Sequence, residues 1–156
     1  MLPIITGETQ EVLHRRVERV ADPTAPEIRA LIPEMIETMR KADGVGLAAP
    51  QIDRSISMCV VEVNGVVSVY FNPKIIRMSE EKVIFEEGCL SLPGEFFPIE
   101  RSEKITIRYD DTAGKSRKLT LTGFLAIVLQ HEIDHLEGTL IIDRYRSQNI
   151  KNAYAL

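Results

Sequence analysis

Two of the chain's three histidines, His131 and His135, stand four residues apart in the stretch QHEIDHLEG. If this stretch is helical, a rotation of about 100° per residue puts both imidazoles on one face, about 40° apart and one turn from each other. Glu132 and Asp134 then flank the pair, each about 60° from its nearer histidine. This is the H-E-x-x-H pattern, in which two imidazoles bind one divalent cation and a carboxylate handles a proton. The pattern predicts a metal centre, although the helical wheel alone does not choose between Glu132 and Asp134 as the base.

The apolar run FLAIVL, from Phe124 to Leu129, leads directly into this stretch. A helix that is apolar on every side belongs in a protein core, where histidines and acids need partners. A bound cation meets that need, because it takes the imidazole lone pairs and its charge favours a buried, ionised carboxylate. The alternative is an exposed helix that contains two histidines by chance, and the apolar run argues against it.

A catalytic metal centre needs a third protein ligand and one position left open for water. Downstream, Ile141 takes the place of the third histidine in the longer H-E-x-x-H-x-x-G-x-x-H pattern, and the remaining acids lie near the helix end. Upstream, Cys89 lies between Gly88 and Pro93, a setting typical of a loop that presents a thiolate. Cys59 lies in an apolar strand pattern and is interpreted as a core residue. We therefore predict Cys89 as the third ligand.

The elements that must hold these residues can be predicted from periodicity. Apolar residues recur at helical spacing from Ala25 to Asp43, and Gly44 is expected to end this helix. Pro33 interrupts the pattern, so we expect either a kink or a helix that starts there. A second, long helix is expected from Thr122 as its N-cap to Gly138.

Two β-hairpins are expected between these helices. The turn Asn64-Gly65 joins strands 56–63 and 66–71, and the segment 110–114 joins strands 105–109 and 115–121. The elements predict a single α+β catalytic domain over residues 1–156. We expect mixed or antiparallel β-sheets around a central helix that carries the H-E-x-x-H motif, with a second, N-terminal helix.

Length and composition exclude several classes of protein. The 156 residues suffice for one domain with its own core, and 44% of them are hydrophobic. With 19 Lys and Arg against 23 Asp and Glu, and no basic stripe, nucleic-acid recognition is not expected. No apolar stretch reaches the roughly 18 residues of a membrane span, and the N-terminus MLPIITGETQ lacks the features of a targeting peptide. Because two cysteines do not form a disulfide framework, we expect a reducing, cytoplasmic location.

Three stretches together resemble the peptide deformylase family: GVGLAAPQ (Gly44 to Gln51), EGCLS (Glu87 to Ser91) and QHEIDHLEG (Gln130 to Gly138). They occur in the family's order and at its approximate spacing, and the resemblance extends from residue 26 to residue 143. It implies an enzyme that hydrolyses the formyl group from the N-terminal formylmethionine of newly synthesised proteins. It also implies one divalent cation per chain, with Fe²⁺ expected and Zn²⁺, Ni²⁺ or Co²⁺ able to substitute.

The resemblance assigns roles to residues of this sequence. It implies that Glu132 accepts the proton of the attacking water and hands it to the leaving amine. It implies that the side-chain amide of Gln51 and the backbone N–H of Leu90 donate hydrogen bonds to the formyl oxygen. Asp134 is interpreted as a supporting residue that pairs with Arg101. The implied metal ligands are Cys89, His131 and His135.

The resemblance also implies how a formylated peptide binds. Gly44 and Gly46 lack a Cβ and would let a peptide backbone approach, and Val45 and Gly46 would pair with it as an added strand. Glu87 is expected either to orient a neighbouring ligand or to bond the substrate's first residue. An apolar slot for the methionine side chain would be lined by Val45, Phe85, Phe124, Ile127 and Val128, of which the last three are also explained by core packing.

Two features depart from the family or lie where it varies. Phe96 stands where some deformylases carry an arginine that reaches the substrate, so binding beyond methionine is expected to rest on apolar contact. Arg144, Arg146 and Lys151 form a small basic cluster that is interpreted as a solvated end, with a transient ribosome contact as the other interpretation. The expected partners of a deformylase are nascent formylmethionyl peptides. Two other functions stay open: an H-E-x-x-H metallopeptidase and a non-enzymatic metal-binding module.

Overall fold

The structure is a computed structural model that describes residues 1–150, so that Lys151 of the basic cluster lies outside the described residues. Short 3-10 helices cover Glu11–His14 (η1) and Ala49–Ile52 (η2). The α-helices are α1 (Pro26–Lys41), α2 (Gly123–Leu136) and α3 (Ile141–Gln148). The strands are β1 (Gly46–Ala48), β2 (Met58–Val63), β3 (Val66–Met78), β4 (Lys82–Cys89), β5 (Leu92–Ser102), β6 (Lys104–Asp110) and β7 (Ser116–Thr122).

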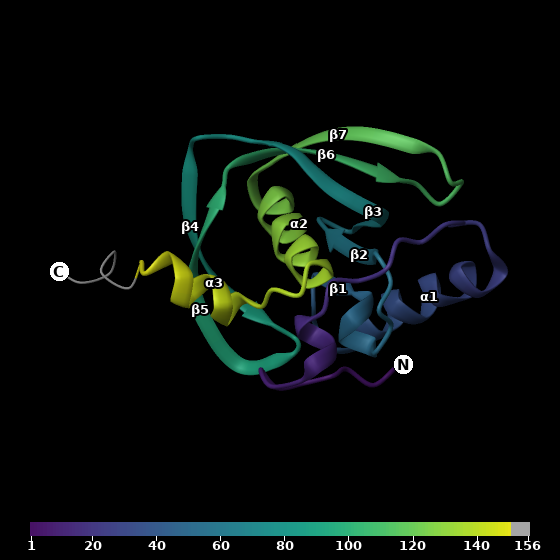
Figure 1. Ribbon diagram of the computed structural model, residues 1–156, viewed down its shortest axis with the longest axis horizontal. Helices are drawn as coiled ribbons and strands as arrows, with labels where there is room; N and C mark the ends of the chain where they lie inside the picture. Colours follow the sequence, from purple (N-terminus) through teal and green to yellow (C-terminus); the bar gives the residue numbers. More distant parts are fainter. Residues whose placement is uncertain (151–156) are drawn as a thin grey trace.

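The strands form two antiparallel sheets, with α2 between them (Figure 1). The larger sheet has the order β1-β2-β3-β6-β7, and the smaller consists of β4 and β5. The predicted α+β fold with a central helix is therefore confirmed. Both predicted hairpins form, and Asn64 and Gly65 take the left-handed φ values of 53° and 74° that a tight hairpin turn needs. The sequence patterns did not predict the β4–β5 hairpin.

Helix α1 differs from its prediction in two respects. It begins at Pro26, where a missing N–H costs nothing, and continues through Pro33, so a helix start at Pro33 was wrong. Leu31, Met35 and Met39 are buried along one face, and this packing offsets the cost of an interior proline. The helix ends at Lys41, before the predicted end at Gly44, and Asp43 follows it with a left-handed φ of 57°.

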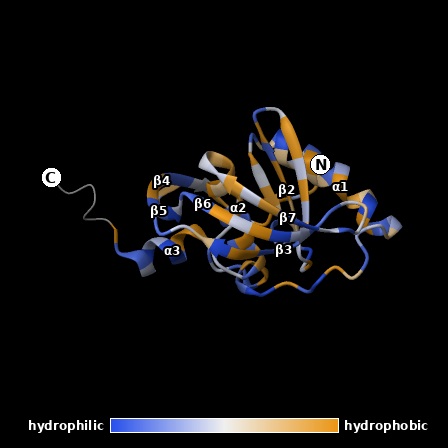
Figure 2. Ribbon diagram, turned by 90° about the horizontal axis from the view of Figure 1, so that it is seen from above, coloured by the Kyte–Doolittle hydropathy of each residue, from blue (hydrophilic) through white to orange (hydrophobic). Residues whose placement is uncertain are grey.

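Helix α2 has the predicted ends. Thr122 is its N-cap residue, although the hydroxyl makes no capping bond, and Gly138 follows with φ 80°. A Cβ on Gly138 would lie 2.7 Å from the backbone carbonyl carbon of His14, so the glycine also lets the N-terminal segment pack against the helix end. Figure 2 shows hydrophobic residues along α2, whereas α3 is mainly hydrophilic.

Helix α3 was not predicted, because the tail is the part of the chain where resemblance was least informative. Its first two residues, Ile141 and Ile142, are buried in a cluster with residues of β5, and its remaining turns carry polar side chains. No helix among residues 1–150 combines the length and the apolar character needed to cross a membrane.

Candidate metal centre and substrate cavity

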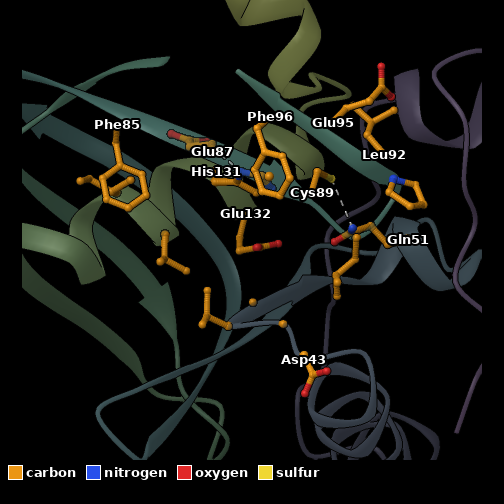
Figure 3. A pocket seen from close by; sticks show the side chains of 18 of the residues that line it. Asp43, Gln51, Phe85, Glu87, Cys89, Leu92, Glu95, Phe96, His131 and Glu132 are labelled. Atoms are coloured by element: carbon orange, nitrogen blue, oxygen red, sulfur yellow. Dashed lines mark hydrogen bonds and ion pairs between the residues drawn. The ribbon is translucent and has the colours of Figure 1, made fainter. Parts of the chain in front are cut away.

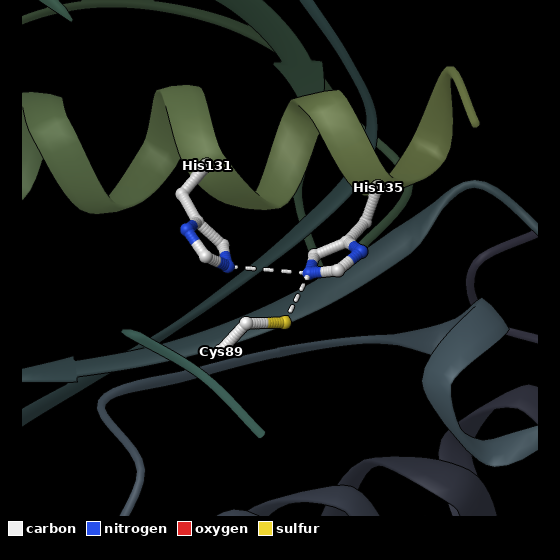
Figure 4. A group of neighbouring side chains, drawn as sticks. All are labelled: Cys89, His131 and His135. Carbon is white, nitrogen blue, oxygen red and sulfur yellow. Dashed lines mark hydrogen bonds between the residues drawn. The ribbon is translucent and has the colours of Figure 1, made fainter. Parts of the chain in front are cut away.

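Three potential ligand atoms meet between α2 and the end of β4 (Figure 4). The Nε2 atoms of His131 and His135 lie 3.2 Å apart, and Sγ of Cys89 lies 3.4 Å from Nε2 of His135. With ligands at ~2.0–2.3 Å from a tetrahedral ion, neighbouring donor atoms are about 3.4–3.6 Å apart. The two distances are close to these values, and all three donor atoms lie within 4.8 Å of one another, so the three side chains fit a single divalent ion. The structure thus brings together the three residues that the sequence predicted as ligands.

The local backbone around Cys89 differs from the predicted loop. Cys89 is the last residue of β4, and Pro93 is the second residue of β5, which begins after a two-residue turn. The register shifts between Gly88 and Cys89, so that Cys89 pairs with Leu92 and the regular ladder ends there. Such a bulge re-aims a side chain. The thiol of Cys89 points toward the two histidines of α2 (Figure 4).

Glu87 on β4 contacts Nδ1 of His131, the ring nitrogen that does not face the other two candidate ligands. Its Oε1 lies 2.9 Å from Nδ1 of His131, and Arg101 donates two hydrogen bonds to the same carboxylate at 2.7 and 2.8 Å. Burial raises the pKa of Glu87, but the bonds from Arg101 and His131 outweigh it and bring the pKa below its usual value. An ionised Glu87 keeps a proton on Nδ1 of His131 and leaves Nε2 free to bind a cation. Of the two expected roles of Glu87, this geometry matches the orientation of a ligand.

The expected pairing of Asp134 with Arg101 is present, at 2.6 Å between Oδ2 and Nη1. Asp134 therefore points away from the cavity, on the side of α2 that faces β5. Arg144 of α3 binds the same carboxylate at 2.6 and 3.0 Å. The structure thus separates the two acids that the helical wheel could not, because Glu132 alone lines the cavity.

Glu132 is a buried carboxylate with an unpartnered oxygen. Its side chain lies at the floor of the cavity (Figure 3), and Oε2 has no hydrogen-bond partner among residues 1–150. Burial raises the pKa of Glu132 to about 7, close to the range suited to proton transfer at neutral pH. Nδ1 of His135 is likewise buried without a partner, and burial holds the pKa of His135 well below its usual value. A neutral His135 is the form that binds a cation.

Gln51 is fixed so that its amino group faces the site. Its Oε1 accepts a bond from the Ala48 N–H at 2.9 Å, and its Nε2 lies 3.1 Å from Ser91 Oγ and 3.8 Å from Cys89 Sγ. Leu90, whose backbone N–H is the second implied donor, lines the same cavity. Both are thus near the ligands, and their role toward a formyl oxygen stays a prediction.

A cavity of about 390 Å³ opens beside these residues (Figure 3). Exposed aromatic side chains make its mouth apolar: Phe85 and Phe124 pack with ring centroids 5.6 Å apart and planes tilted by 42°, and Phe96 is 63% exposed. The sequence did not predict that residues around the β4–β5 turn line this cavity. The one signal in this segment was Pro93-Gly94, a dipeptide that is typical of turns. The predicted substrate residues Gly44, Val45, Gly46, Phe85, Glu87, Phe124, Ile127 and Val128 all line the cavity; the missed ones are Asp43, Gly88, Leu92, Pro93, Gly94 and Glu95.

The two glycines of the first block have a packing role that the sequence did not predict. A Cβ on Gly46 would lie 2.8 Å from Cδ of Glu132, and a Cβ on Gly44 would lie 2.7 Å from Cδ1 of Leu90. The missing Cβ atoms therefore make room for these two side chains of the site itself. That the two glycines also let a substrate backbone approach stays a prediction.

Strand β1 is an edge strand and can accept another strand. Gly46 pairs with Val61 of β2, and the carbonyl of Val45 accepts a bond from the N–H of Glu62 at 2.8 Å. Because hydrogen-bonded and non-hydrogen-bonded pairs alternate in an antiparallel ladder, the main-chain groups of Gly46 face the free edge. The Val45 carbonyl, in contrast, is used within the sheet.

Comparisons with known proteins agree with this geometry. The family model of polypeptide deformylases matches residues 1–151. The chain is 42% identical over 137 residues to the peptide deformylase of Dictyoglomus thermophilum, covering 88% of this chain and 86% of that one. It is similar to the crystal structure of peptide deformylase from Thermotoga maritima, with a TM-score of 0.88, 41% identity and coverage of 92% and 97%. A Met-Ala-Ser-bound class I type b peptide deformylase from Acinetobacter baumannii matches with a TM-score of 0.87 and 31% identity, covering 92% of this chain and 98% of that one.

Proposed function

Because the chain belongs to the polypeptide deformylase family, we propose that it removes the formyl group from the N-terminal formylmethionine of newly synthesised proteins, and that residues 1–156 form one catalytic domain for this reaction. The family is enzymatic and metal-dependent. The single observation that carries the proposal for this chain is the meeting of three ligand atoms beside a buried carboxylate at the floor of one cavity.

Cys89, His131 and His135 would hold the divalent ion. When bound, the ion lowers the pKa of water and polarises a carbonyl group. One thiolate and two imidazoles suit both Fe²⁺ and Zn²⁺, so the donor set does not select between them. We propose Fe²⁺, as the family resemblance implies, with Zn²⁺, Ni²⁺ or Co²⁺ as substitutes. Among residues 1–150 no further His, Cys, Asp or Glu joins the three, which leaves a coordination position open for water.

Glu132 is the general base and acid of the proposed reaction. It accepts a proton from the water that adds to the formyl carbon, and it returns this proton to the nitrogen as the C–N bond breaks. Formate and a free α-amine are the products. The NH₂ group of Gln51 and the backbone N–H of Leu90 would donate to the formyl oxygen as negative charge develops on it.

The peptide would bind along the free edge of β1. Main-chain groups of Gly46 would pair with it as an added strand, and the methionine side chain would enter the apolar part of the cavity. Phe85 and Phe124 flank this part, with Ile127 and Val128 on the wall formed by α2. The exposed ring of Phe96 would contact residues that follow the methionine.

The basic cluster gives little support to a ribosome contact. Arg144 is engaged with Asp134 inside the molecule, and Arg146 lies 3.4 Å from Glu8. A transient contact with the ribosome and a cytoplasmic location stay predictions.

A direct assay separates the three functions. The chain is loaded anaerobically with Fe²⁺ and incubated with formyl-Met-Ala-Ser and with acetyl-Met-Ala-Ser, and formate and peptide fragments are measured. A deformylase releases formate from the first peptide and leaves the second intact. Cleavage between residues would instead identify a metallopeptidase, and silence with both peptides a binding module.

A matched pair of variants tests the base. Glu132→Gln is expected to lower kcat by about 10²–10⁴-fold while the metal is retained, because only proton transfer is removed. Glu137→Gln is the control, since it makes the same change at an exposed position just past the end of the same helix. Equal rates in the two variants would contradict the role of Glu132.

A further inference from the structure

Four buried or half-buried charges connect a metal ligand to the C-terminal helix. From His131 the contacts run to Glu87, then to Arg101, then to Asp134 on α2, and end at Arg144 on α3. Every contact is 3.0 Å or shorter. The four charged groups comprise two acids and two arginines, so the chain is neutral as a whole.

Arg101 uses all three of its guanidinium nitrogens to bind the acids on either side of it. Its Nε and Nη2 bind the two oxygens of Glu87, while its Nη1 binds Asp134. Only 4% of its side chain is exposed. Its orientation therefore depends on both carboxylates, and a shift of either one is passed to the guanidinium.

Arg144 fixes the far carboxylate in two places. Its Nη2 lies 2.6 Å from Oδ1 of Asp134, and its Nε lies 3.0 Å from Oδ2. This two-pronged contact is specific to the planar guanidinium, because a lysine ammonium is a point charge. Oδ2 of Asp134 binds both Arg144 and Arg101. By holding this carboxylate, Arg144 sets the position in which Arg101 can bind it.

Helix α3 is docked to the protein without Arg144. Gln148 makes two bonds of 2.9 Å with the backbone of Glu100 on β5, and Ile141 and Ile142 are buried. These contacts can hold the helix in place when Arg144 is replaced. The contact between Arg144 and Asp134 is therefore not needed to hold α3 in place.

We propose that Arg144 is a positioning residue for the metal centre, which holds the ligand His131 in its binding orientation through Asp134, Arg101 and Glu87. The inference rests on the proposed function, since it assumes that His131 binds the metal. Loss of the fork on Asp134 would let Arg101 move and loosen its grip on Glu87. His131 would then sample orientations in which Nε2 no longer faces the ion.

The test measures metal release and does not depend on catalysis. Zn²⁺-loaded wild type, Arg144→Ala, Arg144→Lys and Arg146→Ala are mixed with an excess of a chromophoric chelator, and the release rate is recorded. Partners that contact a ligand directly are worth about 10–100-fold in affinity, so the more remote Arg144 is expected to accelerate release by about 3–10-fold. Arg146→Ala is the matched control, because Arg146 lies on the same helix, is 64% exposed, and among residues 1–150 forms an ion pair only with Glu8, at 3.4 Å.

The lysine variant distinguishes position from charge. Removing a positive charge near a cation would by itself slow release, whereas lost positioning speeds it. Arg144→Lys retains the charge without the fork and is expected to release Zn²⁺ faster than wild type. It also serves if Arg144→Ala does not fold, which circular dichroism would show.

Each outcome decides the proposal. Faster release in both Arg144 variants with a wild-type rate in Arg146→Ala supports it. Unchanged or slower release in the Arg144 variants overturns it, as does equal acceleration in Arg146→Ala. A protein that releases Zn²⁺ in this pattern but yields no formate from formyl-Met-Ala-Ser would refute the proposed function and leave the positioning role intact.

Discussion

Replacing Gly46 by alanine should disable the site without removing its metal. The added Cβ would lie 2.8 Å from Cδ and 3.0 Å from Cγ of Glu132, whereas carbon atoms in contact are ordinarily ~3.5–4.0 Å apart. The carboxylate must therefore move by about 0.5–1 Å. A displacement of this size costs a reaction about 10²-fold, and overpacking a core costs about 1–3 kcal/mol of stability. We therefore expect kcat/KM to fall by about 10²-fold, with one metal ion per chain retained.

The assay is formate release by metal-loaded Gly46→Ala, with metal content and thermal unfolding measured on the same sample. Gly88→Ala is the matched control, because its Cβ would also meet a neighbour at 2.8 Å, namely the ring of Phe96. That ring is 63% exposed and can swing aside. A wild-type kcat in Gly46→Ala, or an equal loss in Gly88→Ala, would refute the argument that Gly46 exists to make room for Glu132.

Three other predictions concern pH, the metal and the substrate. Because burial raises the pKa of Glu132 from 4.5 to about 7, the metal-free protein should lose stability as pH rises through this range, by up to about 3 kcal/mol. Urea unfolding of the wild type and Glu132→Gln at about pH 5 and about pH 8 checks this, and parallel pH profiles would contradict it. The Fe²⁺ form should lose activity in air faster than the Ni²⁺ form, because a thiolate beside an open iron position is prone to oxidation; equal aerobic half-lives would show this to be wrong. None of the described residues that line the cavity is Lys or Arg, whereas Asp43 and Glu95 are acidic, so kcat/KM for formyl-Met-Ala-Lys should exceed that for formyl-Met-Ala-Glu at low salt by a factor of about 2–5. The preference should shrink at high salt and in Glu95→Gln, and a salt-independent preference would argue against a charge effect.

The parts of the fold that the sequence predicted are those whose signals are local. The turn Asn64-Gly65 and the alternation around it suffice to define one hairpin, and the apolar run before His131 defines α2. The β4–β5 hairpin escaped because its residues, among them Gly88 and Pro93, disfavour strands in isolation. It forms because β5 packs Leu92 and Ile99 against the segment that includes α3, a contact between distant parts of the chain.

The three candidate ligands were predictable, whereas the residues that support them were predictable only in part. His131 and His135 are fixed relative to each other by helix geometry alone, and Cys89 was the only thiol outside an apolar pattern. The roles of Gly44 and Gly46 depend on which side chains cross the loop in space, which spacing along the chain does not reveal. The contact of Arg144 with Asp134 likewise requires α3, an element that no motif announced.

The polar residues of α2 divide into those that are satisfied and those that are not. Gln130 exchanges bonds with the main chain of Ser102, and Asp134 is held by two arginines. In Glu132 and His135, by contrast, one buried atom each has no partner among residues 1–150. An unpaired buried polar atom costs about 1–3 kcal/mol, so a sequence shaped for stability alone would have paired or replaced it. Because Gln130 and Asp134 on the same helix are fully paired, the unpaired oxygen of Glu132 supports the proposal that this carboxylate is kept free to accept the proton of the reaction.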